Sequence, residues 1–155
     1  MTRTHLILIA TLGSVALLLG AYGFQHLGGL APCKMCLWQR WPHAAAILIG
    51  ALLLAGASRF LAWFGALAAA ITGGIGIYHA GVEWGWWPGP TSCTGSGMDL
   101  GSMTGGDLLS LDGPLGVVMC DEIVWQFLGL SMAGWNAVIS FALVLIWVAA
   151  ARRLA

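Results

Sequence analysis

The chain has 155 residues, of which 59% are hydrophobic and 8% are charged, and its mean hydropathy is +0.88. Six basic and six acidic residues give a net charge of zero. These values exclude an ordinary soluble globular domain and predict a protein that lies in a lipid bilayer, with no nucleic-acid partner.

Four stretches come close to the roughly 20 apolar residues that a membrane-spanning helix needs. They cover about residues 6–24, 41–57, 60–79 and 132–151. The chain is therefore predicted to be one domain over residues 1–155, an all-α integral membrane four-helix bundle. A short loop over about 25–40 and a long loop over about 81–131 would lie on the same side of the membrane.

The first stretch also resembles a signal peptide. Arg3 precedes an apolar run that ends in small residues around Ala21-Tyr22-Gly23, which is the pattern of a cleavable leader. Cleavage is the alternative to a first span, and in both cases the cysteines would lie outside the cytoplasm.

The basic residues predict the orientation, because Lys and Arg accumulate in cytoplasmic segments. Four arginines fall on the face that carries both termini: Arg3, Arg59, Arg152 and Arg153. All six acidic residues fall between the third and fourth spans, on the face that carries the cysteines. We therefore expect cytoplasmic termini. Lys34 and Arg40 depart from this asymmetry, which makes them candidates for a functional role.

The start of the second helix is open in the sequence. If the helix includes Cys36, the Arg40 guanidinium and the cysteine sulfur share one helical face, and the N-terminal end of the helix dipole favours a thiolate. Pro42 suggests the alternative of a helix that begins near Trp41, because proline prefers the first helical turn. Arg40 would then be an ordinary charge at the membrane boundary.

The long outer segment is rich in Gly, Ser, Thr and Pro. This composition predicts a mostly irregular chain. Within it, the apolar residues of Asp107–Leu111 are dense enough for a short helix that lies in the membrane interface.

The four cysteines form a close pair, Cys33 and Cys36, and a distant pair, Cys93 and Cys120. Thiols outside the cytoplasm favour disulfides, and four cysteines allow three connectivities. The most economical one joins Cys33 to Cys36 and Cys93 to Cys120. Because a very small loop adds little stability, a purely structural role fits the close pair poorly, although it remains reasonable for the distant pair.

Electron counting indicates a terminal acceptor. Exchange between dithiols moves two electrons without removing them from the system, so a net oxidase must pass them on. The sequence has no Gly-x-Gly-x-x-Gly dinucleotide fingerprint and no Cys-x-x-Cys-His haem attachment site. An active pair at the membrane boundary favours an acceptor dissolved in lipid, for which a quinone is the obvious candidate.

Two other functions remain open. One is a metal carrier that uses the four thiolates, although only the close pair has metal-like spacing. The other is a non-enzymatic membrane scaffold with two structural disulfides.

The chain resembles the disulfide bond formation protein B (DsbB) family of bacterial inner-membrane thiol oxidases, and the resemblance covers nearly its whole length. Three segments carry it: Pro32-Cys33-Lys34-Met35-Cys36 with Gln39-Arg40, the segment from Glu83-Trp84 to Gly89-Pro90 and Cys93, and Cys120 with Trp125, Phe127-Leu128-Gly129-Leu130 and Trp135.

The resemblance implies an enzyme that reoxidises a periplasmic DsbA-like thiol oxidase. Cys93 would form the mixed disulfide with that partner, and Cys120 would complete the loop pair. Cys33 and Cys36 would reoxidise the loop dithiol, and Cys36 would pass the electrons to ubiquinone or menaquinone. The cysteine loops would be periplasmic.

The resemblance also implies two further quinone-side residues. Arg40 matches the arginine of the family that lies beside the quinone, where its charge would stabilise the Cys36 thiolate and negative charge on the quinone oxygen. His79 falls close to the position of a family histidine near the quinone. Its alternative role is packing at the end of a span.

Overall fold

The structure, a computed structural model, describes residues 2–90, 93 and 119–153. Four long helices lie in this part of the chain: α1 (Arg3–His26), α2 (Lys34–Leu54), α3 (Leu61–Glu83) and α5 (Met132–Arg152). Two short strands, β1 (Gln126–Phe127) and β2 (Leu130–Ser131), form an antiparallel hairpin directly before α5. The interfacial helix expected at Asp107–Leu111 lies outside the described residues.

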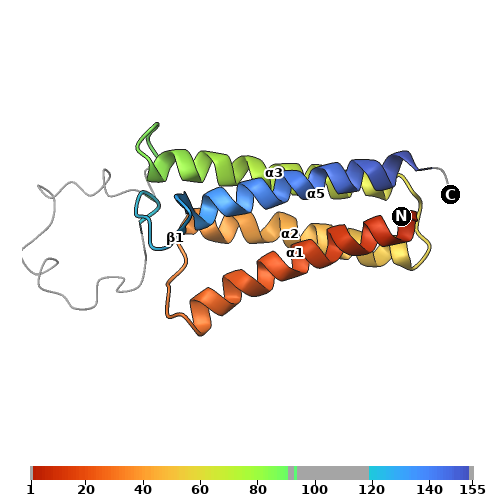
Figure 1. Cartoon of the computed structure of the whole chain (residues 1–155), viewed down its shortest axis with the longest axis horizontal. Helices are drawn as coiled ribbons and strands as arrows, with labels where there is room; N and C mark the ends of the chain where they lie inside the picture. The colour runs from red at the N-terminus through yellow and green to blue at the C-terminus, as the bar shows by residue number, and fades with distance from the viewer. Residues whose placement is uncertain (1, 91–92, 94–118, 154–155) are drawn as a thin grey trace, which may run out of the picture.

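The four helices form a bundle in which each helix packs mainly against two others. α3 packs against α5 and α2, and α1 packs against α2 and α5 (Figure 1). The first residues of α1 and the last of α5 lie at one end of the bundle, and the hairpin lies at the other. The predicted all-α class is thus confirmed for the described residues, with the small hairpin as an addition.

Three of the described helices, α1, α3 and α5, are long and apolar enough to cross a membrane. Large apolar side chains point away from the bundle, as lipid-facing residues do. More than half of the side chain is exposed at Leu12, Leu19, Leu48, Phe64 and Leu145. Helix α2 is more polar, because its first half contains Gln39, Arg40 and His43. That α2 also spans the membrane therefore stays a prediction.

Helix α2 begins at Lys34 and includes Cys36. The sulfur of Cys33 caps its N-terminus by accepting the backbone N–H of Cys36 at 3.0 Å. The alternative start near Trp41 is therefore wrong, and Pro42 lies inside the helix. Neighbouring helices can compensate for an internal proline, and α2 packs against α1 and α3.

Small residues allow the helices to approach closely near the end that carries the termini. The core there combines alanines with a few large side chains: Leu6, Ile7, Leu53, Leu143 and Trp147. Trp147 is fully buried, and a Cβ atom added to Gly65 would lie 2.8 Å from its ring. Gly65 on α3 is therefore a packing residue, as expected for small residues between membrane helices.

Replacing Gly65 by alanine should lower the free energy of unfolding by about 1–3 kcal/mol, because the added methyl group overpacks the contact with Trp147. Gly74, on the same helix, is the matched control, since nothing lies within 4 Å of its added Cβ. Gly74→Ala should be neutral or stabilising by up to about 1 kcal/mol, because alanine is the better helix former. Denaturant unfolding in detergent measures both, and equal effects would refute the role given to Gly65.

Candidate redox site

The four cysteines meet at the end of the bundle away from the termini. Cys33, Cys93 and Cys120 are buried in one cluster with Met35 and Val82, and Cys36 packs against it. Cys93 and Cys120 form a disulfide, as predicted. Cys33 and Cys36 are free thiols, so the second predicted disulfide is not formed in this structure.

Three reactive atoms from distant parts of the chain lie together in this cluster. The Sγ atoms of Cys33 and Cys120 and a ring nitrogen of His79 all lie within 4.8 Å of one another. The two cysteine pairs are therefore close enough for exchange after small movements. The same three atoms could surround a metal ion, but the disulfide of Cys120 leaves that sulfur without the negative charge of a thiolate ligand.

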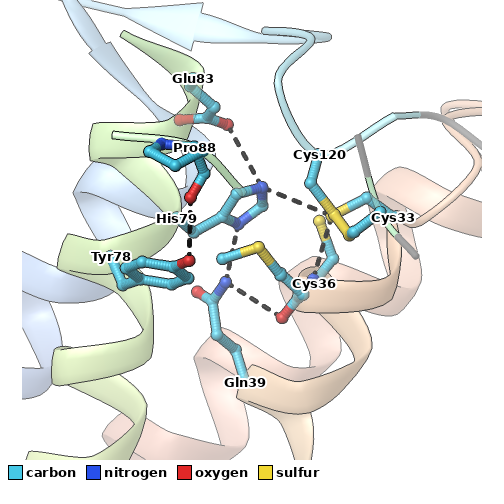
Figure 2. Close-up of a disulfide and its surroundings, with 10 residues drawn as sticks. Cys33, Cys36, Gln39, Tyr78, His79, Glu83, Pro88 and Cys120 are labelled. Carbon is cyan, nitrogen blue, oxygen red and sulfur yellow. Dashed lines mark hydrogen bonds and ion pairs between the residues drawn. A yellow bond between two sulfur atoms is a disulfide. The ribbon is translucent and has the colours of Figure 1, made fainter. Parts of the chain in front are cut away.

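His79 stands between the cysteines and a second buried side chain (Figure 2). Its Nε2 lies 3.4 Å from the Sγ of Cys33 and 3.8 Å from Oε1 of Glu83, one turn further along α3. Its Nδ1 lies 2.9 Å from Nε2 of Gln39 on α2. Only 2% of His79 is exposed, and the ring also forms a hydrogen bond with the backbone of Cys120. The structure thus places His79 beside the cysteine pair.

A cavity of about 420 Å³ adjoins the close cysteine pair. Its polar lining includes Cys33, Cys36, Arg40 and His79, while most of its wall is apolar and comes from Ala16, Leu17, Phe24, Leu30, Trp125 and Ile139. A concave apolar site with a few convergent polar groups is the usual form of a small-molecule site. The structure therefore brings the predicted quinone-side residues to one cavity.

Arg40 is held at this cavity by residues of α1. Its Nη1 donates to Oε1 of Gln25 at 2.7 Å, its Nη2 lies 3.5 Å from the carbonyl of Ala21, and its guanidinium lies over the Tyr22 ring at 4.7 Å. The buried Nε of Arg40 has no hydrogen-bond partner among the described residues. Arg40 is thus a fixed positive group in the lining of the cavity, with one buried donor that no described residue satisfies.

The two thiols of the close pair differ in acidity. Both sulfurs lie ahead of Trp41, where the predicted second span begins. A hydrogen bond from the Cys33 thiol lowers the pKa of Cys36, and the positive charge of Arg40 lowers it further, against the opposing effects of burial and of Glu83. The same hydrogen bond, together with burial, raises the pKa of Cys33. Cys36 is therefore the first thiolate of the pair, and it faces the cavity.

This difference predicts the pH dependence of alkylation. A depressed pKa leaves Cys36 deprotonated at a pH where an ordinary thiol is still protonated. Its alkylation rate should therefore reach half of its maximum at a pH below the pKa range of ordinary thiols. Arg40→Gln should move that midpoint upward, because the stabilising charge is lost. Mass spectrometry after timed alkylation locates the modified cysteine, and a Cys36 midpoint at or above the ordinary thiol range would contradict the assignment.

The sequence reasoning gave no role to several polar side chains around His79. Glu83 is largely buried, and its Oε2 lacks a partner among the described residues. Gln39, Asn136 and His43 form a hydrogen-bonded group inside the bundle. The signal that could have found them is polarity itself, because polar residues inside apolar helices usually mark functional sites.

Comparison with known proteins identifies the family. The family described as "Disulfide bond formation protein DsbB" matches residues 3–150. The chain is 30% identical to disulfide bond formation protein B of Polaromonas sp. over 95% of this chain and 89% of the relative. It is 35% identical to the protein of the same name from Pasteurella multocida, over 91% of this chain and 84% of the relative.

A relative from Xanthomonas oryzae pv. oryzae, with the same name, is 36% identical over 84% of this chain and 80% of its own length. No solved structure matches the chain. The match over nearly the whole chain confirms the family predicted from the sequence, and three helices of the structure have the length and composition of membrane spans. The chain therefore belongs to the DsbB family of membrane disulfide bond formation proteins.

Proposed function

We propose that the chain is a quinone-dependent membrane thiol oxidase that reoxidises a DsbA-like periplasmic protein and so supports disulfide formation in exported proteins. The observation that carries this proposal is the meeting of the two cysteine pairs, with Cys33 and Cys120 sulfurs within 4.8 Å. Cys36 adjoins the same cluster and lines the apolar cavity. This order of groups suits a relay from the outer loop to the membrane.

The relay begins at the loop disulfide. A thiolate of the reduced partner attacks Cys93, which forms a mixed disulfide and releases Cys120 as a thiolate. The second partner thiolate then attacks the partner sulfur of this mixed disulfide. The partner leaves as a disulfide, and its two electrons remain with Cys93 and Cys120 as thiolates.

The electrons next pass to the close pair. The Cys120 thiolate attacks Cys33 of a Cys33–Cys36 disulfide, and Cys36 leaves as a thiolate. The Cys93 thiolate then attacks Cys120, which restores the loop disulfide and releases Cys33 as a thiolate. The products are a loop disulfide and a Cys33–Cys36 dithiol, which is the pairing of the four cysteines in the structure.

A quinone fits the cavity beside Cys36, because the walls are apolar and Arg40 offers a buried donor without a protein partner in the described part of the chain. When bound, a quinone supplies an acceptor for two electrons and two protons. Ubiquinone and menaquinone both meet this need. Cys36 would deliver the electrons, Arg40 would stabilise negative charge, and His79 lies at the cavity beside Cys33.

The proposed location is the bacterial inner membrane, with several spans, cytoplasmic termini and periplasmic cysteine loops. Its support is the separation of the two ends of the bundle. Arg3, Arg59 and Arg152 lie at the helix ends near the termini, while the redox cluster lies at the other end (Figure 1). The excess of arginine at one end is the pattern of a cytoplasmic face.

Quinone-dependent oxidation of a reduced DsbA-like protein by the purified chain in detergent tests this function. We expect one quinone to be reduced for each partner disulfide formed. A folded, fully oxidised protein that reduces no quinone would instead support a scaffold. Zinc that copurifies, and is lost when Cys93 or Cys120 is replaced, would support a metal carrier.

A further inference from the structure

Two amide side chains, the buried Gln39 and the half-buried Asn136, connect α5, α2 and α3 beside the redox cluster. Nε2 of Gln39 lies 3.2 Å from the backbone carbonyl of Met35, and Nδ2 of Asn136 lies 3.3 Å from the backbone carbonyl of Thr72. A backbone carbonyl only accepts hydrogen bonds. Each contact therefore requires the amide nitrogen at that position, and together they determine how both amides are oriented.

The contacts between the amides agree with this orientation. Asn136 donates from Nδ2 to Oε1 of Gln39 at 2.7 Å and to Oγ1 of Thr72 at 3.2 Å. Thr72 in turn donates its hydroxyl proton to the backbone carbonyl of Gln39 at 3.0 Å. On its other side, Oδ1 of Asn136 accepts from Nε2 of His43 at 2.9 Å. Every donor of this group faces an acceptor, so turning either amide would break several bonds.

The orientation of Gln39 determines the protonation of His79. An N–H of Gln39 faces Nδ1 of His79 at 2.9 Å, so Nδ1 must be the unprotonated acceptor. The proton of the neutral ring then lies on Nε2. Nε2 is also the atom 3.4 Å from the sulfur of Cys33, which accepts the backbone N–H of Cys36 as well.

We propose that Gln39 and Asn136 are positioning residues that hold His79 in the tautomer protonated at Nε2, so that His79 donates a hydrogen bond to Cys33 and does not act as its base. The tautomer follows from the hydrogen bonds alone. Its consequence for the reaction rests on the proposed function. When Cys93 attacks Cys120, the Cys33–Cys120 bond breaks, the Cys93–Cys120 bond forms and Cys33 departs as a thiolate. A donor aimed at the departing sulfur stabilises that thiolate and speeds its release.

Other charged or titratable groups also face this site. Cys36 lies beside Cys33, and Glu83 lies 3.8 Å from Nε2 of His79. The backbone of Cys120 is a further hydrogen-bond partner of His79. The test must therefore separate the hydrogen bond of His79 from the charge of Cys36. A Cys36→Ser background with an intact Cys93–Cys120 disulfide does this, because it leaves Cys33 as the one free thiol of the four cysteines.

The direct test is ¹⁵N nuclear magnetic resonance of the full chain, labelled at histidine, in detergent without quinone or partner. We expect His79 to show a protonated Nε2 and a hydrogen-bonded, unprotonated Nδ1. In Gln39→Glu, a carboxylate faces Nδ1, and that nitrogen should become protonated. Ser140→Ala is the matched control, because Ser140 contacts Asn136 only at Oδ1, at 3.4 Å, and should leave the His79 spectrum unchanged. A protonated Nδ1 in the wild type would overturn the proposal without any substitution.

The second test measures the alkylation rate of Cys33 in the Cys36→Ser background at one fixed pH. Gln39→Met keeps the side-chain volume but removes the donor to His79, and His79→Phe removes the ring nitrogens. Both should slow alkylation by about tenfold, the effect of one hydrogen bond to a charged group. A rate unchanged by Gln39→Met would overturn the positioning role, and a rate unchanged by His79→Phe would overturn the hydrogen bond to Cys33. Neither result depends on turnover, so a failure of the proposed function is recognised separately by the quinone assay.

Discussion

Cys36→Ser should abolish quinone reduction, lowering turnover by more than about 10³-fold, because the sulfur that we propose delivers the electrons is lost. This substitution leaves the loop disulfide intact, since Cys93 and Cys120 bond to each other. A reduced partner should therefore still form a mixed disulfide at Cys93. Quinone absorbance measures quinone reduction, and non-reducing electrophoresis measures formation of the mixed disulfide.

Cys93→Ser is the matched control, with the opposite expected pattern. The partner should no longer form its mixed disulfide, while a small dithiol that reduces the Cys33–Cys36 disulfide directly should still drive quinone reduction. Two separable partial reactions are the signature of a relay through two pairs. Quinone reduction that survives in Cys36→Ser, or that disappears with the small dithiol in Cys93→Ser, would show that the order of electron transfer is wrong.

Arg40→Gln should lower kcat/KM for the quinone by about 10²-fold, the usual effect of removing one donor from a charge-stabilising site. Arg40 lines the cavity, and its Nε has no hydrogen-bond partner within the described ranges. The substitution removes both this donor and the positive charge that lowers the pKa of Cys36. Initial rates at varied quinone concentration, with saturating reduced partner, give kcat and KM for the quinone.

Arg59→Gln is the control for Arg40. Arg59 is a cation of the same type, but it lies near the start of α3 at the far end of the bundle, with its guanidinium 5.8 Å from the Phe60 ring centre. Its replacement should leave the kinetics with quinone unchanged. Equal losses in the two variants would mean that a general loss of charge or stability, and not the position of Arg40, causes the effect.

Local properties of the sequence were sufficient for the bundle and the family. Apolar runs long enough for membrane spans predicted the positions of α1, α3 and α5 closely, because hydrophobicity and length act within one segment. The pairing of Cys93 with Cys120 was also predicted and is present. The start of α2 could not be decided, because Pro42 and the cap formed by Cys33 give opposite local signals.

The arrangement of the site depended on packing between segments that are distant in the chain. Cys33 comes from the start of α2, His79 from the end of α3 and Cys120 from the segment before the hairpin, yet their reactive atoms lie within 4.8 Å. Asn136 reaches Gln39 only because α5 and α2 both pack around α3. Spacing along one helix predicts its own neighbours, such as Cys36 and Arg40. Contacts between helices depend on how each is rotated and shifted against the others, and these are determined by the packing of all the helices together.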